Sequence, residues 1–188
     1  QNFFPGDDKS VQVPMMSLKD DFGLYESKDV QVLEMPYDGK RLSMVILLPR
    51  ERGGLAELEG ALSVEKLKAW LGELAVEEVR VMLPRFKLTS RFDLGQTLKQ
   101  MGMPLAFAPG RADFSGMNGR RDLFIGKVIH QAWVEVDEQG TEAAAATAVG
   151  VMLTAAPTFF RADHPFLFLI RDRETGSILF LGRVVDPS

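Results

Sequence analysis

The stretch EQGTEAAAAT, residues 138–147, decides how this sequence is interpreted. Its four consecutive alanines favour a helix, because alanine has the highest intrinsic helix propensity. The stretch nevertheless follows VIHQAWVEV, residues 128–136, whose β-branched and aromatic residues predict a strand. It also lies shortly before VMLTAAPTFF, residues 151–160, which contains a proline. An almost featureless segment between a strand and a loop therefore needs an explanation.

A period of two divides residues 141–153 into two different faces. One face is uncharged and its side chains grow along the chain: Thr141, Ala143, Ala145, Thr147, Val149, Val151 and Leu153. The other face carries the only charge, on Glu142. Such a strand could enter a sheet with its first face buried, because no side chain there is large enough to clash. The alternative is an ordinary alanine-rich surface helix capped by Thr141, and the pattern alone leaves both interpretations open.

The rest of the chain predicts an α+β fold in which strands predominate. Asp-Gly within YDGK, residues 37–40, favours a turn with positive φ between two apolar runs, and so predicts a hairpin. RETG, residues 173–176, predicts a second hairpin between FLFLIRD and SILFLGRVV. We expect a turn at DDFG, residues 20–23, and one strand over residues 78–92.

Helices are predicted between these strands. The apolar spacing in residues 63–74 is helical, and Ser63 is a suitable N-cap. A further helix is expected over residues 93–103, with Asp93 as its cap and Gly102 near its end.

Composition excludes several classes of function. The net charge of −4 and a pI near 5.3 argue against nucleic acid or an anionic membrane as a partner. No apolar run reaches the ~18–20 residues needed to cross a bilayer. Without cysteine, and with two histidines, the chain offers no soft-metal cluster, so no metal or cofactor is expected. Cysteine usage leaves the compartment open between cytoplasm and secretion.

The motifs of common enzyme classes are absent from the sequence. Ser115 does not lie in a G-x-S-x-G elbow, and no glycine-rich phosphate loop is present. Asp163 and His164 are adjacent, and adjacent residues of an extended segment point to opposite faces. We therefore expect no hydrogen-bonded Asp–His pair and a structural role for His164. The chain is predicted not to be an enzyme.

Residues 134–147, with the pattern VxxxExGTEAAAAT, resemble the hinge of the reactive-centre loop in serpins, the serine protease inhibitor superfamily. Other segments are similar to the family in order and spacing: VPMM (13–16), VLEMPYDGKRLSMVILLP (32–49), LPRFKL (83–88), FDL (92–94), LKQMGM (98–103), ADFSGM (112–117), FRADHPFLFLIRD (160–172) and ILFLGRVVDP (178–187). The resemblance covers essentially the whole chain. It implies a serpin fold, with mixed and antiparallel β-sheets, a few helices and a mobile loop.

The resemblance also implies that residues 1–188 are the C-terminal half of a single serpin domain, with hinge and loop at about 138–160. The N-terminal half is then a partner, either on another chain or in a missing segment. A lone half would leave sheet edges and apolar faces uncovered, so we expect it not to fold stably alone.

By the same resemblance the protein is an inhibitor that acts as a suicide substrate. A target serine protease cleaves the loop, which then inserts as a strand into the central sheet of a metastable fold and traps the acyl-enzyme. The hinge residues implied are Glu138, Gly140, Thr141, Glu142, Ala143, Ala144, Ala145, Ala146 and Thr147. The small residues on the face to be buried favour an inhibitor over the alternative, a non-inhibitory serpin acting as a binding or chaperone-like module.

The family's usual loop spacing places the scissile bond between Thr154 and Ala155, within a bait window completed by Met152, Leu153 and Ala156. A small bait residue suits elastase-like or subtilisin-like proteases. A bond after Met152 or Leu153 would instead suit chymotrypsin-like targets.

Three residues match positions that control opening of the family's central sheet. His130 matches a buried histidine where the central strands part, and Glu138 matches an acid at the base of the loop. Arg85, in LPRF, matches the basic partner of that acid.

The family favours an extracellular location, although a cytoplasmic one is compatible with the sequence.

Overall fold

The structure is a computed structural model that describes residues 1–6, 9–137 and 158–188. The chain separates into two compact units. The first contains Gln1–Phe86 and Val136–Ser188, and the second contains Lys87–Glu135.

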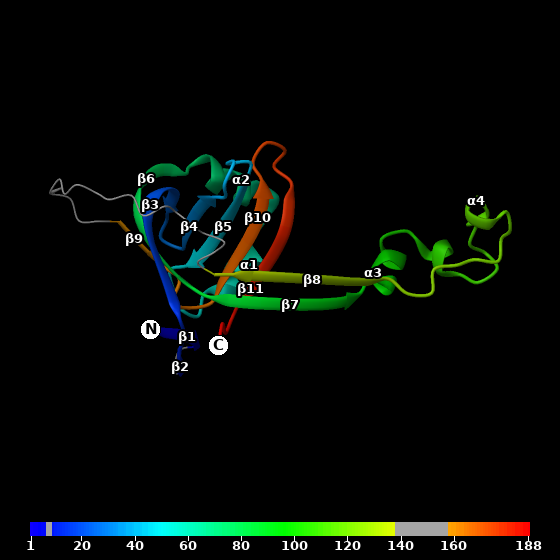
Figure 1. The fold of residues 1–188 in the computed structure, drawn as a ribbon, viewed down its shortest axis with the longest axis horizontal. Helices are drawn as coiled ribbons and strands as arrows, with labels where there is room; N and C mark the ends of the chain where they lie inside the picture. The colour runs from blue at the N-terminus through cyan, green and yellow to red at the C-terminus, as the bar shows by residue number, and fades with distance from the viewer. Residues whose placement is uncertain (7–8, 138–157) are drawn as a thin grey trace. The chain divides into compact units, whose positions relative to one another are not determined.

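A seven-stranded sheet forms most of the first unit, in the order β11-β10-β5-β4-β3-β6-β9 (Figure 1). All neighbours are antiparallel except β6 and β9, which are parallel. The strands are β3 (Met15–Glu26), β4 (Val30–Pro36), β5 (Leu42–Pro49), β6 (Ala75–Pro84), β9 (Thr158–Arg161), β10 (Phe166–Asp172) and β11 (Ile178–Val184). A separate pair, β1 (Asn2–Gly6) and β2 (Lys9–Gln12), lies at the N-terminus.

Both predicted hairpins are confirmed. β4 and β5 are joined through Gly39 and Lys40, which have φ of 76° and 56°. β10 and β11 are joined through Gly176, with φ of 74°. The positive φ values explain why Asp-Gly and Thr-Gly stand at these turns, because glycine adopts this conformation without steric cost.

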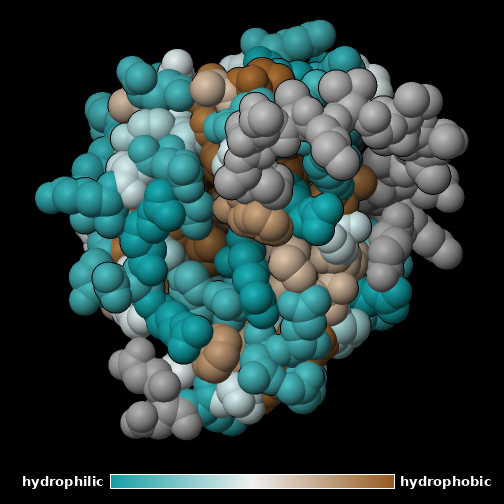
Figure 2. Space-filling view, turned by 90° about the vertical axis from the view of Figure 1, so that its left-hand side faces the viewer, coloured by the Kyte–Doolittle hydropathy of each residue, from teal (hydrophilic) through white to brown (hydrophobic). Residues whose placement is uncertain are grey.

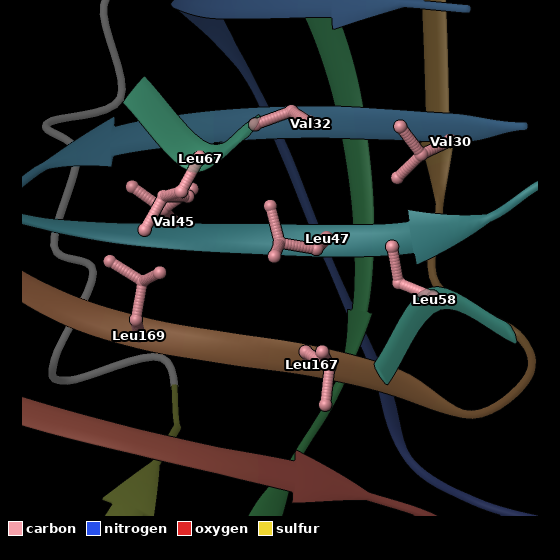
Figure 3. Close-up of a cluster of buried hydrophobic side chains, with 8 residues drawn as sticks. All are labelled: Val30, Val32, Val45, Leu47, Leu58, Leu67, Leu167 and Leu169. Atoms are coloured by element: carbon pink, nitrogen blue, oxygen red, sulfur yellow. The ribbon is translucent and has the colours of Figure 1, made fainter. Parts of the chain in front are cut away.

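Two helices cover one face of the sheet. α1 (Leu55–Ala61) and α2 (Val64–Gly72) contribute Leu58 and Leu67 to a buried cluster (Figure 3). Ser63 caps α2 as predicted, since its side chain accepts a hydrogen bond from the Lys66 N–H over 3.2 Å. The strands supply alternate residues to the same cluster: Val30, Val32, Val45, Leu47, Leu167 and Leu169. Each such burial stabilises the fold by ~1.5–3 kcal/mol.

The opposite face is rich in aromatic residues. Phe86 lies edge-on to Phe166, with ring centroids 6.0 Å apart, and tilted against Phe168 at 5.3 Å. Gly182 of β11 is required beside them, because a Cβ there would lie 2.7 Å from two carbons of the Phe168 ring.

Gly182→Ala should therefore destabilise the protein by about 1–3 kcal/mol, the usual cost of overpacking a core. Phe168 is 2% exposed and cannot swing away into solvent. Urea unfolding measures the effect, with Gly60→Ala in α1 as the control, since a Cβ there meets nothing within 4 Å. An unchanged free energy of unfolding for Gly182→Ala would contradict the packing described.

Two strand predictions were wrong. Residues 20–23 form no turn but lie within β3, because a ladder from Met15–Pro84 to Leu24–Ala75 keeps them extended beside β6. Residues 78–92 are not one strand, because Pro84 ends β6 and a new strand starts at Phe86 in a different sheet. Proline lacks the N–H needed to continue a ladder.

The second unit contains most of β7 (Phe86–Asp93) and β8 (Ile129–Val136), which form a two-stranded sheet. Between them lie α3 (Gly95–Gln100), a 3₁₀ turn η1 (Pro104–Phe107) and α4 (Ser115–Asn118). The predicted cap of α3 was placed one residue early: Leu94 is the N-cap, and Asp93 Oδ1 accepts from the Gly95 N–H over 3.0 Å.

Candidate reactive loop and its flanking strands

The predicted hinge, bait window and scissile bond, within residues 138–156, lie outside the described residues. The structure does define the strands on either side of them. β8 ends at Val136, and β9 begins at Thr158. The candidate loop therefore leaves a strand of the two-stranded sheet and rejoins the edge of the seven-stranded sheet.

β8 has an open edge in the part of the chain that the structure describes. There it pairs only with β7, and its other edge has no strand partner. Unpaired N–H and C=O groups along such an edge are able to accept another strand. His130 lies on β8 and is exposed, so the burial implied by the resemblance is not present among the described residues.

Arg85 lies at the junction between β6 and β7. Its backbone N–H donates to the Pro14 carbonyl oxygen over 3.0 Å, which fixes the point where the chain passes from one sheet to the other. Its expected partner Glu138 is outside the described residues, so an Arg85–Glu138 ion pair stays a prediction.

The distal end of the loop is held by β6. β9 runs parallel to it, with Thr158 beside Val79 and Phe159 beside Arg80. The Thr158 hydroxyl donates to Glu77 Oε2 over 3.0 Å, and the Arg80 guanidinium lies 5.8 Å from the centre of the Phe159 ring. Sequence reasoning missed these contacts, because a parallel register between distant segments leaves no local signal.

A turn at Asp163 and His164 joins β9 to β10, and here the expectation of no Asp–His pair was wrong. His164 Nδ1 lies 2.9 Å from Asp163 Oδ1, and the Nε2–H donates to the Pro49 carbonyl oxygen over 2.8 Å. The segment is bent rather than extended, since the Asp163 N–H donates back to the Arg161 carbonyl oxygen. His164 is 6% exposed, which agrees with a structural role.

Opposing effects act on the Asp163 carboxyl group. Burial raises its pKa, but the hydrogen bond from His164 and the positive charges of His164, Arg161 and Arg52 lower it, and the net pKa is below the usual value. The carbonyl oxygen of Asp163 also accepts from the Phe4 N–H over 2.8 Å. The turn thus links β9 to β1 and to the end of β5.

A pH prediction follows from the lowered pKa of Asp163. A carboxyl group with a depressed folded-state pKa stabilises the fold above its unfolded pKa of ~3.9, and this stability is lost as the pH falls through the folded-state value. The free energy of unfolding of Asp163→Asn should therefore fall less than that of wild type as the pH is lowered below about 5. Unfolding curves at several pH values measure this difference. Asp20→Asn, at an exposed position of β3, is the control. Parallel pH profiles for wild type and Asp163→Asn would contradict the assignment.

A buried charged cluster was also missed. Glu34 Oε1 accepts from the Arg171 guanidinium over 2.7 and 3.0 Å and from the Ser43 hydroxyl over 2.7 Å. Arg173 Nε lies 3.5 Å from the same oxygen. The side chains of Glu34 and Arg171 are only 7% and 18% exposed, so this cluster supports the sheet rather than a surface site.

Within the described ranges there is no group of three or more histidine, aspartate or glutamate residues placed to hold a metal ion. No helix in those ranges is long and apolar enough to span a membrane.

The family is shown by comparison with known proteins. The family model for serpins, described as serine protease inhibitors, matches residues 1–187, and the chain belongs to the serpin family. It is 46% identical to a leukocyte elastase inhibitor of Equus caballus, covering 96% of this chain and 50% of that protein. It is 44% identical to an uncharacterized serpin-like protein of Thermococcus kodakarensis, covering 95% and 42%.

A solved structure supports the same fold. Uncleaved ovalbumin matches with a TM-score of 0.89 at 33% identity, over 100% of this chain and 51% of the ovalbumin chain. The predicted fold class is therefore confirmed. The chain spans about half the length of the curated relatives it matches.

Proposed function

We propose that this chain is the loop-bearing part of a serpin that inhibits serine proteases as a suicide substrate. The protease cleaves the loop and forms an acyl-enzyme, and the freed loop then inserts beside β8 before the acyl bond is hydrolysed. The remaining length of the domain, the N-terminal half, is the partner that completes the central sheet.

The observation that carries this proposal is a run of small residues in the sequence directly after β8, a strand with one open edge among the described residues. Residues 141–147 follow β8 directly, and their alternate face is Thr141, Ala143, Ala145 and Thr147. A chain that turns back along β8 lies antiparallel to it and meets the unpaired edge. At a net ~0.5–1.5 kcal/mol per hydrogen bond, about ten inserted residues contribute an energy comparable with the ~5–15 kcal/mol stability of a domain.

The target class follows from the bait window. We place the scissile bond between Thr154 and Ala155, where small side chains suit a shallow primary pocket. Elastase-like and subtilisin-like proteases have this preference, and the name of the horse relative, a leukocyte elastase inhibitor, supports the same class.

Arg85, Glu138 and His130 are proposed to control sheet opening. An Arg85–Glu138 pair would tie the base of the loop to the junction of β6 and β7. His130 lies on β8, and the inserted loop would pair with this strand and so enlarge the sheet.

The decisive experiment incubates the full-length protein with an elastase-type protease and examines the products on a denaturing gel. We expect a covalent complex that resists SDS, and mass spectrometry of the C-terminal fragment, separated by denaturation, should locate the bond at Thr154–Ala155. Cleaved protein without a complex, and without a gain in thermal stability, would reject inhibition and favour a non-inhibitory binding role.

A further inference from the structure

A row of exposed side chains crosses three strands beside the distal end of the loop. Lys19 of β3 lies opposite Arg80 of β6, and Arg80 lies beside Phe159 of β9, so the three side chains share one face of the sheet. Figure 2 views the first unit from the side of these strands and shows apolar and hydrophilic residues intermixed there. We call these three residues the β9 row.

The chemistry of the β9 row differs from that of an ordinary solvated surface. Phe159 is 51% exposed on an edge strand, and the Arg80 guanidinium lies 5.8 Å from its ring centre. Lys19 is paired with Glu78 at 2.8 Å, whereas the contact found for the Arg80 guanidinium among the described residues is the Phe159 ring. Arginine and aromatic side chains are enriched in the energetically dominant parts of protein interfaces.

Phe159 of the β9 row follows the predicted Thr154–Ala155 scissile bond closely in sequence, and this position indicates the target protease as the partner of the row. Phe159 is four positions after Ala155 in the sequence, and a chain spans at most ~3.3–3.6 Å per residue, so the two are at most about 14 Å apart. A protease domain of about 220 residues has a radius of gyration of about 17 Å. A protease bound at Thr154–Ala155 is therefore large enough to reach the start of β9.

We propose that Arg80 and Phe159, with Lys19 beside them, form a second contact surface for the target protease, on the side of the leaving peptide. This inference rests on the proposed function. The surface fits a protease whose rim carries an acidic side chain next to an apolar one, because the acid meets the Arg80 guanidinium while Phe159 packs against the apolar group. Its effect is on the rate of association, since exposed opposite charges steer encounter.

The test uses charge reversal near the two opposite edges of one sheet, on β6 beside the edge strand β9 and on the edge strand β11. Arg80→Glu changes the surface beside β9, and Arg183→Glu makes the same change in net charge on β11, the opposite edge strand. In the full-length protein, the second-order rate constant for loop cleavage by an elastase-type protease should fall at least tenfold for Arg80→Glu and about twofold or less for Arg183→Glu. The difference should shrink at high salt, because exposed charges are screened.

Phe159→Ser provides a second variant. It should lower the same rate constant by a factor that does not change with salt concentration, because no charge is altered. Equal rate constants for wild type and both β9-row variants, or equal losses for Arg80→Glu and Arg183→Glu, would overturn the second contact surface. The unfolding midpoint of each variant shows whether a loss reflects misfolding.

The same assay separates this inference from the proposed function. If wild type is cleaved without forming an SDS-resistant complex, inhibition fails, and the cleavage rate constants of the variants still decide the role of the β9 row. If no protease of the elastase or subtilisin type cleaves the loop, both are overturned.

Discussion

Thr141→Arg should convert the inhibitor into a substrate. Thr141 is the first residue on the face that the proposed insertion buries, and an arginine there would have to leave water without a partner. Insertion would slow, and each ~1.4 kcal/mol added to its barrier costs a factor of ten in rate. Hydrolysis of the acyl-enzyme would then be faster than trapping. We expect the yield of SDS-resistant complex to fall at least tenfold, while cleavage of the loop continues at the wild-type rate.

Glu142→Arg is the matched control for Thr141→Arg. The residue is adjacent in sequence, and at a period of two the proposed insertion would leave its side chain on the other face, outside the sheet. Complex yield should remain close to that of wild type. Equal yields for wild type and Thr141→Arg, measured by densitometry of the denaturing gel, would contradict insertion as the trapping step.

Arg171→Met should destabilise the sheet strongly. It leaves the Glu34 carboxylate, 7% exposed, without its closest charged partner at 2.7 Å. Breaking a buried ion pair from one side costs ~3–5 kcal/mol, since an uncompensated charge remains. The Ser43 hydroxyl and Arg173 stay near the carboxylate and keep the cost toward the lower end of that range. Denaturant unfolding of the variant measures it.

Two further variants make the Arg171 prediction specific. Lys19→Met breaks an ion pair with Glu78 whose side chains are both 47% exposed, and such pairs contribute only ~0–1 kcal/mol. The double substitution Glu34→Leu with Arg171→Met removes both charges and should recover most of the lost stability. A double variant no more stable than Arg171→Met would show that the cluster does more than neutralise Glu34.

The features that were predictable from sequence are those set by local chemistry. Asp38-Gly39 and Thr175-Gly176 specify turns through residues next to one another, and Ser63 caps α2 through a backbone N–H three residues later. The loop hinge stays a prediction, because it rests on an alternation between two faces and on a family pattern in residues outside the described ranges. These signals need no knowledge of the tertiary fold.

The features that escaped prediction depend on segments far apart in the chain. Glu34 and Arg171 are separated by 137 residues and meet only because β5 aligns β4 with β10. Cross-strand pairing with β6 also overrides the turn propensity at residues 20–23. The Asp163–His164 contact failed for a different reason, because an extended geometry was assumed where the chain bends.

The arrangement of the strands after the loop has a consequence for the cleaved molecule. Residues 158–188 contribute β9 at one edge of the sheet, β11 at the other, and β10 between β5 and β11. Six residues of β10 are paired with β5, from Leu167–Leu47 to Asp172–Leu42. A cut at the predicted bond would therefore divide the polypeptide without releasing a peptide. Gel filtration should show one particle of unchanged mass, and only a denaturing gel should show two chains.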